Sequence, residues 1–333
     1  MLVEKKRQGL VLRGSRNIFT VRPAGGNAPE TLECRVKGKV LKGVEGFYNP
    51  LAPGDFVQLE ADPLHPGKGL ILSVEPRRNR FTRLNQKGQG SKRHSGARQA
   101  EAPQLLAANL DLVLCVATPA SPPWRPRFLD RLLLQADIAG IPPLIICNKW
   151  DLFDGDPDIE ERLEDFRGLG YGVHRVSVKT GQGLEELRRL LSGRIAALAG
   201  QSGVGKSSLV NALIPGTMQR TGGLNGKYDR GNHITSLSAL LEGPPPESIR
   251  LVDTPGIRRL LPDGVSAADL ILYLREFAPL AGRCTYGLSC SHAAEPGCKI
   301  MEAVAAGVIH EDRYESFLRI REELRGSYGE NYA

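Results

Sequence analysis

The chain has 333 residues, of which 41% are hydrophobic and 24% charged, values that fit a globular protein of two or three domains. Because no apolar run approaches the roughly 18 residues of a membrane-spanning helix and the N-terminal residues lack the apolar core of a signal peptide, we expect a cytoplasmic protein without membrane contact. The net charge of +7 is concentrated in residues 1–98, where 19 Lys and Arg face 8 Asp and Glu; this excess favours nucleic acid as a partner, with a merely solubilising basic surface as the alternative.

The first 76 residues are predicted to form a small all-β barrel. Short apolar stretches alternate there with polar residues and are separated by Gly, Pro and Asn, as in barrels built from short strands. The clearest of these stretches are residues 9–12, 19–21, 32–36 and 56–59. Residues 77–106 are interpreted as a basic linker, because residues 77–98 contain eight Lys or Arg and no acidic residue.

Residues 107–265 are predicted to form an α/β domain with a parallel sheet. Apolar runs typical of buried strands alternate there with helical patterns, which indicates βαβ units. The expected strands are 111–117, 143–147, 172–178 and 194–199, and the expected helices are 126–139, 158–168 and 183–192. Residues 266–333 are predicted to form a helical domain around a Cys/His cluster, with a charged helix near residues 310–325.

Residues 200–207 match the phosphate-binding pattern G-x4-G-K-[ST] in full. They follow an apolar strand and precede a helical run, which is the context that the pattern requires. The glycines allow backbone N–H groups to surround phosphate oxygens, Lys206 should reach the β- and γ-phosphates, and Ser207 should bind Mg²⁺. The expected phosphate-binding residues are Gly200, Gln201, Ser202, Gly203, Val204, Gly205, Lys206, Ser207 and Ser208.

Asn148, Lys149 and Asp151 form the pattern N-K-x-D, which indicates guanine as the base. An Asp carboxylate only accepts hydrogen bonds, and guanine offers it a pair of N–H donors that adenine lacks. Asn148 can meet the N7 and O6 side of the base, and the aliphatic part of Lys149 can pack on the ring. These four positions alone would be a weak match, but together with the phosphate-binding loop they predict a GTP site.

A second loop that contacts the base is expected at Ser177, Val178 and Lys179, directly after a predicted strand. These residues resemble the S-A-K loop of GTPases, in which backbone N–H groups meet guanine O6. An ordinary strand-to-helix turn is the alternative interpretation.

Two motifs after the phosphate-binding loop are predicted to sense the γ-phosphate. Asp253 and Gly256 belong to a D-x-x-G element, in which the Asp holds Mg²⁺ through water and the Gly N–H senses the phosphate. Thr235, in a polar stretch between the two motifs, is the expected Mg²⁺ ligand beside Ser207. The alternatives are neighbouring Ser236 and a solvated loop.

The order of the motifs is circularly permuted. GTPases of the Ras type run from the phosphate-binding loop through the switch Thr and D-x-x-G to N-K-x-D and S-A-K. Here the last two come first, at residues 148 and 177, and the others follow at residues 200, 235 and 253. The same sheet can form if the original termini are joined and the chain is opened elsewhere, since domain termini lie at the surface and often close together.

The glutamine that many GTPases use to orient the attacking water is replaced here. Its position directly after D-x-x-G is occupied by Ile257, which cannot hydrogen-bond water. His233, two residues before Thr235, is the nearest titratable candidate for a catalytic role. A histidine in a solvated loop is the alternative.

Cys284, Cys290, His292 and Cys298 combine three thiols and one imidazole within a short segment. In a cytosolic protein such a set favours a metal over a disulfide, and three Cys with one His form a closed tetrahedral set for Zn²⁺. Because no position is left for a substrate water, we expect one structural Zn²⁺ rather than a catalytic one.

Over nearly its whole length the sequence resembles the RsgA family of circularly permuted GTPases, which depend on the small ribosomal subunit. Besides the motifs above, the resemblance rests on residues 34–39, 76–79, 107–111, 290–298 and 313–314. It implies an N-terminal OB-fold, a permuted GTPase core and a C-terminal zinc domain. It also implies a role in late maturation of the small subunit, with contact to its rRNA and GTP hydrolysis to GDP that the subunit stimulates. A monomer is expected.

The resemblance also implies a catalytic role for His233. In the family, the histidine of a G-x-H-T-T segment is proposed to help catalysis, and His233 stands at that position. The sequence departs from the segment at Ile234, where the family usually has Thr, while Thr235 is retained.

Two other classes of protein share some of these features. A P-loop kinase for a small molecule would need neither Asn148 nor Asp151. A non-hydrolysing RNA-binding protein would need no intact Lys206, Ser207 or Asp253. The sequence therefore favours a GTPase that acts on an RNA–protein assembly.

Overall fold

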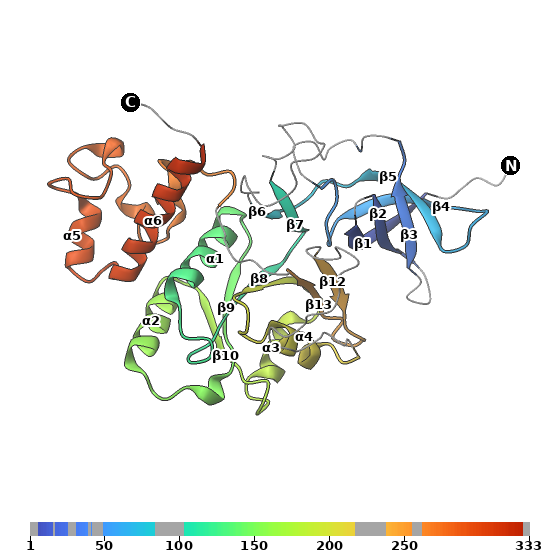
Figure 1. Ribbon diagram of the computed structural model, residues 1–333, viewed down its shortest axis with the longest axis horizontal. Coiled ribbons are helices and arrows are strands. Elements are labelled where there is room, and N and C mark those ends of the chain that lie inside the picture. The colour runs from blue at the N-terminus through green and yellow to red at the C-terminus, as the bar shows by residue number, and fades with distance from the viewer. Residues whose placement is uncertain are drawn as a thin grey trace, which may run out of the picture.

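The computed structural model describes residues 6–15, 17–25, 31–38, 41, 49–83, 103–216, 238–254 and 262–328. Within these ranges the chain forms a five-stranded barrel, a central α/β sheet and a C-terminal helical region. Figure 1 shows the barrel strands and the C-terminal helices on opposite sides of the central sheet. The predicted three-part fold is therefore confirmed. No helix in the described part of the chain is both long and apolar enough to cross a membrane.

The barrel is closed by one strand that pairs with two partners. Its strands are β1 (Arg7–Ser15), β2 (Ile18–Pro23), β3 (Leu32–Val36), β4 (Phe56–Ala61) and β5 (Lys68–Val74). β1 pairs antiparallel with both β2 and β4, and β3 pairs parallel with β5. Alternate side chains, among them Val11, Val21 and Val57, are fully buried inside the ring. The period-two pattern of the sequence thus becomes the inner face of the barrel.

The central sheet has the strand order β12-β13-β11-β8-β9-β10. Its strands are β8 (Leu112–Ala117), β9 (Pro143–Cys147), β10 (Gly172–Arg175), β11 (Ile195–Gly200), β12 (Ala239–Glu242) and β13 (Arg250–Asp253). All neighbours in this order are parallel except β12, which runs antiparallel to β13. The middle strands are buried on both faces, which explains why they read as continuous apolar runs.

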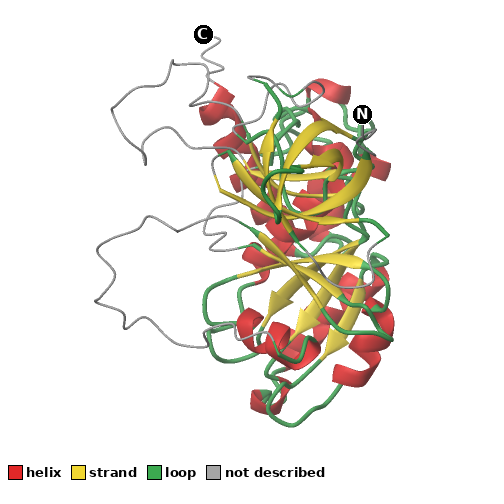
Figure 2. Cartoon of the chain, turned by 90° about the vertical axis from the view of Figure 1, so that its right-hand side faces the viewer, coloured by secondary structure: helices red, strands yellow, loops and turns green. Residues whose placement is uncertain are grey.

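Helices cover both faces of this sheet, as Figure 2 also shows. α1 (Pro126–Ile138) and α2 (Pro157–Gly168) pack on one face, and α3 (Leu184–Leu191) and α4 (Lys206–Leu213) pack on the other. The division follows the strand periodicity, since Val113 and Cys115 of β8 face α1 while Leu114 and Val116 face α3 and α4. The strands and helices predicted for this domain agree with the observed bounds to within three residues.

The two ends of the segment interpreted as a basic linker are strands. β6 (Arg80–Arg83) pairs antiparallel with β7 (Gln104–Ala108). Phe81 and Ala107 are fully buried and pack into the core of the central domain. The basic charge of this segment led to the prediction of a linker. At its two ends, however, a few apolar side chains are buried and the backbone forms strands. Residues 84–102, which hold much of the basic stretch, lie outside the described residues.

The C-terminal region has its own apolar core. It contains three short 3₁₀ helices, η2 (Asp269–Tyr273), η3 (Ala278–Leu280) and η4 (Gly287–Ser289), followed by α5 (Lys299–Ala305) and α6 (Glu311–Tyr328). Leu270, Phe277, Ile300, Phe317 and Leu324 are buried together there. This core lies beside α1, because Leu134 of α1 belongs to the same cluster.

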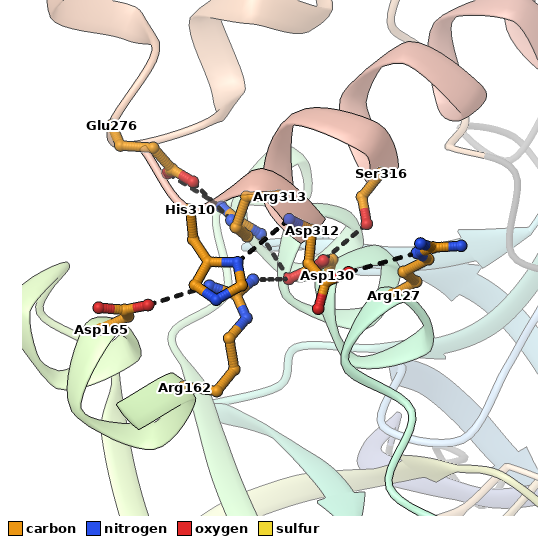
Figure 3. Close-up of polar contacts among 9 residues, drawn as sticks. All are labelled: Arg127, Asp130, Arg162, Asp165, Glu276, His310, Asp312, Arg313 and Ser316. Atoms are coloured by element: carbon orange, nitrogen blue, oxygen red, sulfur yellow. Dashed lines mark hydrogen bonds and ion pairs between the residues drawn. The ribbon is translucent and has the colours of Figure 1, made fainter. Parts of the chain in front are cut away.

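A buried ionic cluster connects α6 to α1 and α2 of the central domain (Figure 3). Asp130 of α1 accepts hydrogen bonds from Arg162 of α2 at 3.2 Å, from Arg313 at 3.1 Å and from Ser316 at 2.7 Å. Arg313 also pairs with Glu276 of the C-terminal region. Two carboxylates thus balance two guanidinium groups, and all four side chains are at most 5% exposed. Removing one member would leave an uncompensated buried charge, which typically costs about 3–5 kcal/mol.

Candidate functional site

The site lies at the edge of the central sheet where the parallel strands end. After β8 the chain passes to α1 on one face, and after the neighbouring β11 it passes to α4 on the other face. Open α/β sheets bind ligands in the crevice beside such a change of direction. The phosphate-binding motif, which joins β11 to α4, therefore stands at the position where a ligand is expected.

The phosphate-binding loop requires its glycines for geometric reasons. Gly203 and Gly205 have φ values of +86° and +90°, a region that other residues rarely adopt. A Cβ on Gly205 would also stand 2.4 Å from the side-chain nitrogen of Asn148. No side chain caps the N-terminus of α4, which starts directly after Gly205. Its first N–H groups and the helix dipole are thus available to an anion.

Lys206 and Asp253 bring opposite charges to this loop. The Lys206 ammonium donates to the carbonyl oxygens of Gly200 and Gln201, each at 2.7 Å. Burial lowers the pKa of Lys206, and the charge of Asp253 partly offsets that effect. Burial likewise raises the pKa of Asp253, with Lys206 opposing. Both groups are poorly solvated, a condition in which a phosphate or a cation bound between them interacts strongly.

Asn148 and Lys149 attach the base motif to the phosphate-binding loop. Asn148 directly follows β9, is 1% exposed and donates from Nδ2 to the carbonyl oxygen of Val204 at 2.8 Å. Lys149 has a left-handed backbone, with φ +58°, and its ammonium donates to the carbonyl oxygens of Ser121 and Gly203. The bonds to Val204 and Gly203 join segments more than 50 residues apart in sequence. The two motifs that the sequence singled out therefore form one site.

Asp151 is held by the loop that follows β10. It accepts a hydrogen bond from the Ser177 hydroxyl at 2.6 Å, and the Lys179 ammonium lies 3.8 Å away. Mainly because of the Ser177 hydrogen bond, the pKa of Asp151 lies below its usual range, so the carboxylate is charged at neutral pH. In the described part of the chain, the backbone N–H groups of Val178 and Lys179 donate to no backbone acceptor outside helices and strands.

The structure places only part of the switch elements. Asp253 is the last residue of β13 and pairs with Leu198 of β11, next to the phosphate-binding loop. The following Thr254 is buried and donates to the Leu198 carbonyl oxygen at 2.5 Å. Ser207 and Ser208 lie in the first turn of α4. His233, Thr235, Gly256 and Ile257 lie outside the described residues, so their predicted roles stay predictions.

The four predicted metal ligands converge in the C-terminal region. The sulfur atoms of Cys284, Cys290 and Cys298 and a ring nitrogen of His292 all lie within 4.8 Å of one another, and all four residues are buried. His292 Nδ1 is 3.5 Å from Cys284 Sγ and 3.4 Å from Cys298 Sγ, and these two sulfur atoms are 3.9 Å apart.

The distances among Cys284, His292 and Cys298 fit a tetrahedrally coordinated cation. Zn–S and Zn–N bonds of about 2.3 and 2.0 Å imply S–S edges of about 3.8 Å and S–N edges of about 3.5 Å. A disulfide would need about 2.05 Å between sulfur atoms. The cluster can therefore hold a metal ion.

Neighbouring residues hold the ligand loop in shape. Glu295 accepts backbone hydrogen bonds from Ser291 at 2.6 Å and from Ala293 at 3.0 Å. Tyr314 of α6 donates to the His292 carbonyl oxygen at 2.8 Å. Such outer contacts orient the ligands of metal sites. Glu295 and Tyr314 were part of the resemblance, but no residue pattern identified them as supports of the metal loop.

Comparison with known proteins decides the family. Residues 74–261 match the family model described as RsgA GTPase. The chain belongs to the RsgA GTPase family. A relative from Gemmatimonas aurantiaca, named small ribosomal subunit biogenesis GTPase RsgA, is 37% identical over 319 residues, covering 96% of this chain and 97% of the relative. A relative with the same name from Moorella thermoacetica is 34% identical over 321 residues, covering 95% and 97%.

Solved structures agree with this family. The crystal structure of YjeQ from Thermotoga maritima aligns with a TM-score of 0.71 and 31% identity, covering 97% of this chain and 99% of YjeQ. The structure of YloQ, described as a circularly permuted GTPase, aligns with a TM-score of 0.68 over 98% of both chains; at 20% identity it supports the fold alone. The predicted family, permuted fold and GTP-hydrolysing activity are confirmed.

Sequence reasoning missed one loop of the nucleotide site. The loop after β8 carries Ser121, whose carbonyl oxygen binds Lys149, and Thr118, whose hydroxyl donates to the Pro122 carbonyl oxygen at 2.7 Å. Its polar residues follow a buried strand at the same sheet edge as N-K-x-D. That position is the signal that could have found it.

Proposed function

We propose that this GTPase binds the small ribosomal subunit and its rRNA in the cytoplasm, assists late maturation of the subunit as a monomer, and hydrolyses GTP to GDP and phosphate faster when the subunit is bound. The relatives that are 31–37% identical to this chain are named small ribosomal subunit biogenesis GTPase. Their alignments cover nearly the whole length of both chains. The proposed binding of GTP rests on one observation: Asn148 and Lys149 of the base motif form hydrogen bonds to the phosphate-binding loop, so the two motifs make one site.

The residues of that site have complementary roles in the proposal. Asp151 binds the paired N–H donors of guanine, and the N–H groups of Val178 and Lys179 meet O6. Asn148 already uses one N–H on Val204, which leaves its second hydrogen for N7. The loop from Gly200 to Ser208 surrounds the phosphates, with Lys206 moving from the loop carbonyls to the β- and γ-phosphates.

Metal ions complete the proposed chemistry. Ser207 and Thr235 would bind Mg²⁺ directly and Asp253 through water, and the ion would neutralise charge on the phosphates. Gly256 would sense the γ-phosphate. His233 would orient the attacking water. The cluster of Cys284, Cys290, His292 and Cys298 would hold one structural Zn²⁺.

The barrel is the part that we propose to contact rRNA. Arg7, Arg13, Arg35, Lys37 and Lys68 are exposed on it. Apart from Lys37, which pairs with Glu60 at 3.5 Å, no described acid forms an ion pair with one of these five side chains. Exposed cations on a barrel can release counterions from RNA phosphates, which is a major source of affinity in protein–nucleic acid complexes.

Phosphate release measured with and without purified small subunits tests the proposed function. We expect subunits to raise turnover about tenfold or more, and large subunits to have no such effect. Lys206→Ala should abolish the stimulated activity, which assigns it to this site. Equal turnover with small subunits, large subunits and no addition would contradict the proposal.

Removal of the metal gives a second test. Protein purified without chelators should contain one zinc per chain by elemental analysis, and Cys290→Ser should lose it, because Zn²⁺ requires the fourth ligand for a closed set. Proteolysis should then increase in residues 266–328 but not in the central sheet. Cys34→Ala, which removes a buried thiol of the barrel, serves as the control and should keep the zinc. Absence of zinc from the parent protein would refute this assignment.

A further inference from the structure

Strand β1 is shared between two apolar cores. Val11 is fully buried in the barrel core, while its neighbours Leu10 and Leu12 pack in the core of the central domain. Leu240 of β12 and Val252 of β13 belong to that same central core. Successive side chains of a strand point to opposite faces, so one strand can serve both cores. The barrel is therefore built into the central domain rather than attached to its surface.

The same strand also extends the central sheet by backbone pairing (Figure 1). Arg13 of β1 pairs with Ala239 of β12, Ala239 pairs with Asp253 of β13, and Asp253 pairs with Leu198 of β11. One row of paired residues thus runs from the barrel to the carboxylate proposed to face Mg²⁺. β12 has only four residues and lies between β1 and β13. A displacement of β1 must therefore act on β12.

An ion pair reinforces this junction at the other end of β12. Arg22 of β2 forms an ion pair with Glu242, the last residue of β12, and their side chains are 32% and 15% exposed. Arg250 of β13 pairs in register with Glu242 and is the other cation that acts on it. A carboxylate that is this poorly solvated depends on its cationic partners, because burial alone disfavours its charge.

We propose that Arg22 and Glu242 are positioning residues that couple docking of a polyanionic partner on the barrel to the geometry of Asp253 in the nucleotide site. This inference rests on the proposed function, since it takes the small subunit as that partner. The barrel and the end of β13 then respond to each other through β1 and β12. Coupling between two binding sites is reciprocal, so the nucleotide bound at Asp253 also changes the barrel.

The first test separates stimulated from intrinsic GTP turnover. Glu242→Gln keeps the size of the side chain and removes its charge. We expect the kcat of subunit-stimulated turnover to fall about fivefold or more, with intrinsic turnover and the KM for GTP within about twofold of the parent. Glu60→Gln is the matched control, because Glu60 is 16% exposed and, among the described residues, its ion pair is with Lys37 of the barrel. Parent-like stimulation in Glu242→Gln would overturn the proposal.

A double-mutant cycle tests whether the two residues act together. If Arg22 and Glu242 form one unit, the double variant Arg22→Gln with Glu242→Gln should lose no more stimulation than Glu242→Gln alone. Losses that multiply would mean that Arg22 acts separately, through contact with the partner, and would overturn the role of the pair.

A second measurement needs no ribosomal subunit. Backbone hydrogen exchange of β1 and β12 should differ between protein bound to GDP and protein bound to a non-hydrolysable GTP analogue, and Glu242→Gln should remove that difference. If exchange in β1 is the same in both nucleotide states of the parent, the coupling is refuted. If this difference is found but small subunits do not stimulate the parent protein, the small subunit is not the partner, while the coupling between the barrel and the nucleotide site is supported.

Discussion

Replacing His233 with alanine should leave GTP affinity nearly unchanged and lower subunit-stimulated turnover by about 10²–10⁴-fold, the usual contribution of an acid–base or orienting group. The reason lies in the neighbouring motif. Ile257 occupies the position at which other GTPases place a glutamine, and an aliphatic side chain cannot orient water. An imidazole near Thr235 could supply the missing hydrogen bond only in the activated complex, so no interaction of the ground state is lost.

The control for this experiment is His65→Ala. His65 lies on the barrel surface with 61% of its side chain exposed and pairs with Asp62, so its loss should change neither activity. Single-turnover phosphate release with saturating subunits gives the rate of the chemical step. Stimulated turnover of His233→Ala within a few-fold of the parent would mean that His233 is an ordinary loop residue. A group of the ribosome acting in trans would then become the better explanation.

Replacing Asp151 with asparagine should weaken GTP binding by about 10²–10⁴-fold. Two hydrogen bonds from guanine to a charged acceptor are lost or weakened, each worth about 1.5–3 kcal/mol. Asp151 suits this role because its hydrogen bond from Ser177 keeps it ionised. An amide presents both a donor and an acceptor, which matches xanthine, whose C2 carries a carbonyl group. Preference should therefore shift toward xanthosine triphosphate.

Equilibrium binding of both nucleotides to the parent and the variant measures this shift. Asp154→Asn is the matched control, since Asp154 is an exposed acid three residues further along the chain. It should leave both affinities unchanged. If Asp151→Asn binds GTP as tightly as the parent, the carboxylate does not recognise the base and the N-K-x-D assignment is wrong.

Much of the nucleotide site could be predicted because its signals are local. β9 spans the predicted residues 143–147, because this apolar run is short, contains β-branched residues and starts at a proline, a combination that indicates a buried strand. The glycines at positions 203 and 205 adopt the positive φ values for which the motif selects glycine. The proximity of Asn148 to the phosphate-binding loop followed from a general rule, because parallel strands end at one edge of the sheet.

From the sequence alone it was possible to predict the family, the three-part fold, the permuted order of the motifs and the four clustered residues that could hold a metal ion. Tertiary structure alone decided how the parts are joined. The sharing of β1 between two cores is one such feature. The pairing of Arg13 with Ala239 and the bond from Arg313 to Asp130 join residues that are about 180 to more than 220 positions apart. A run of alternating residues indicates which side chains are buried, but not which partner buries them. That choice depends on the packing of the complete chain, in which many weak contacts compete at once.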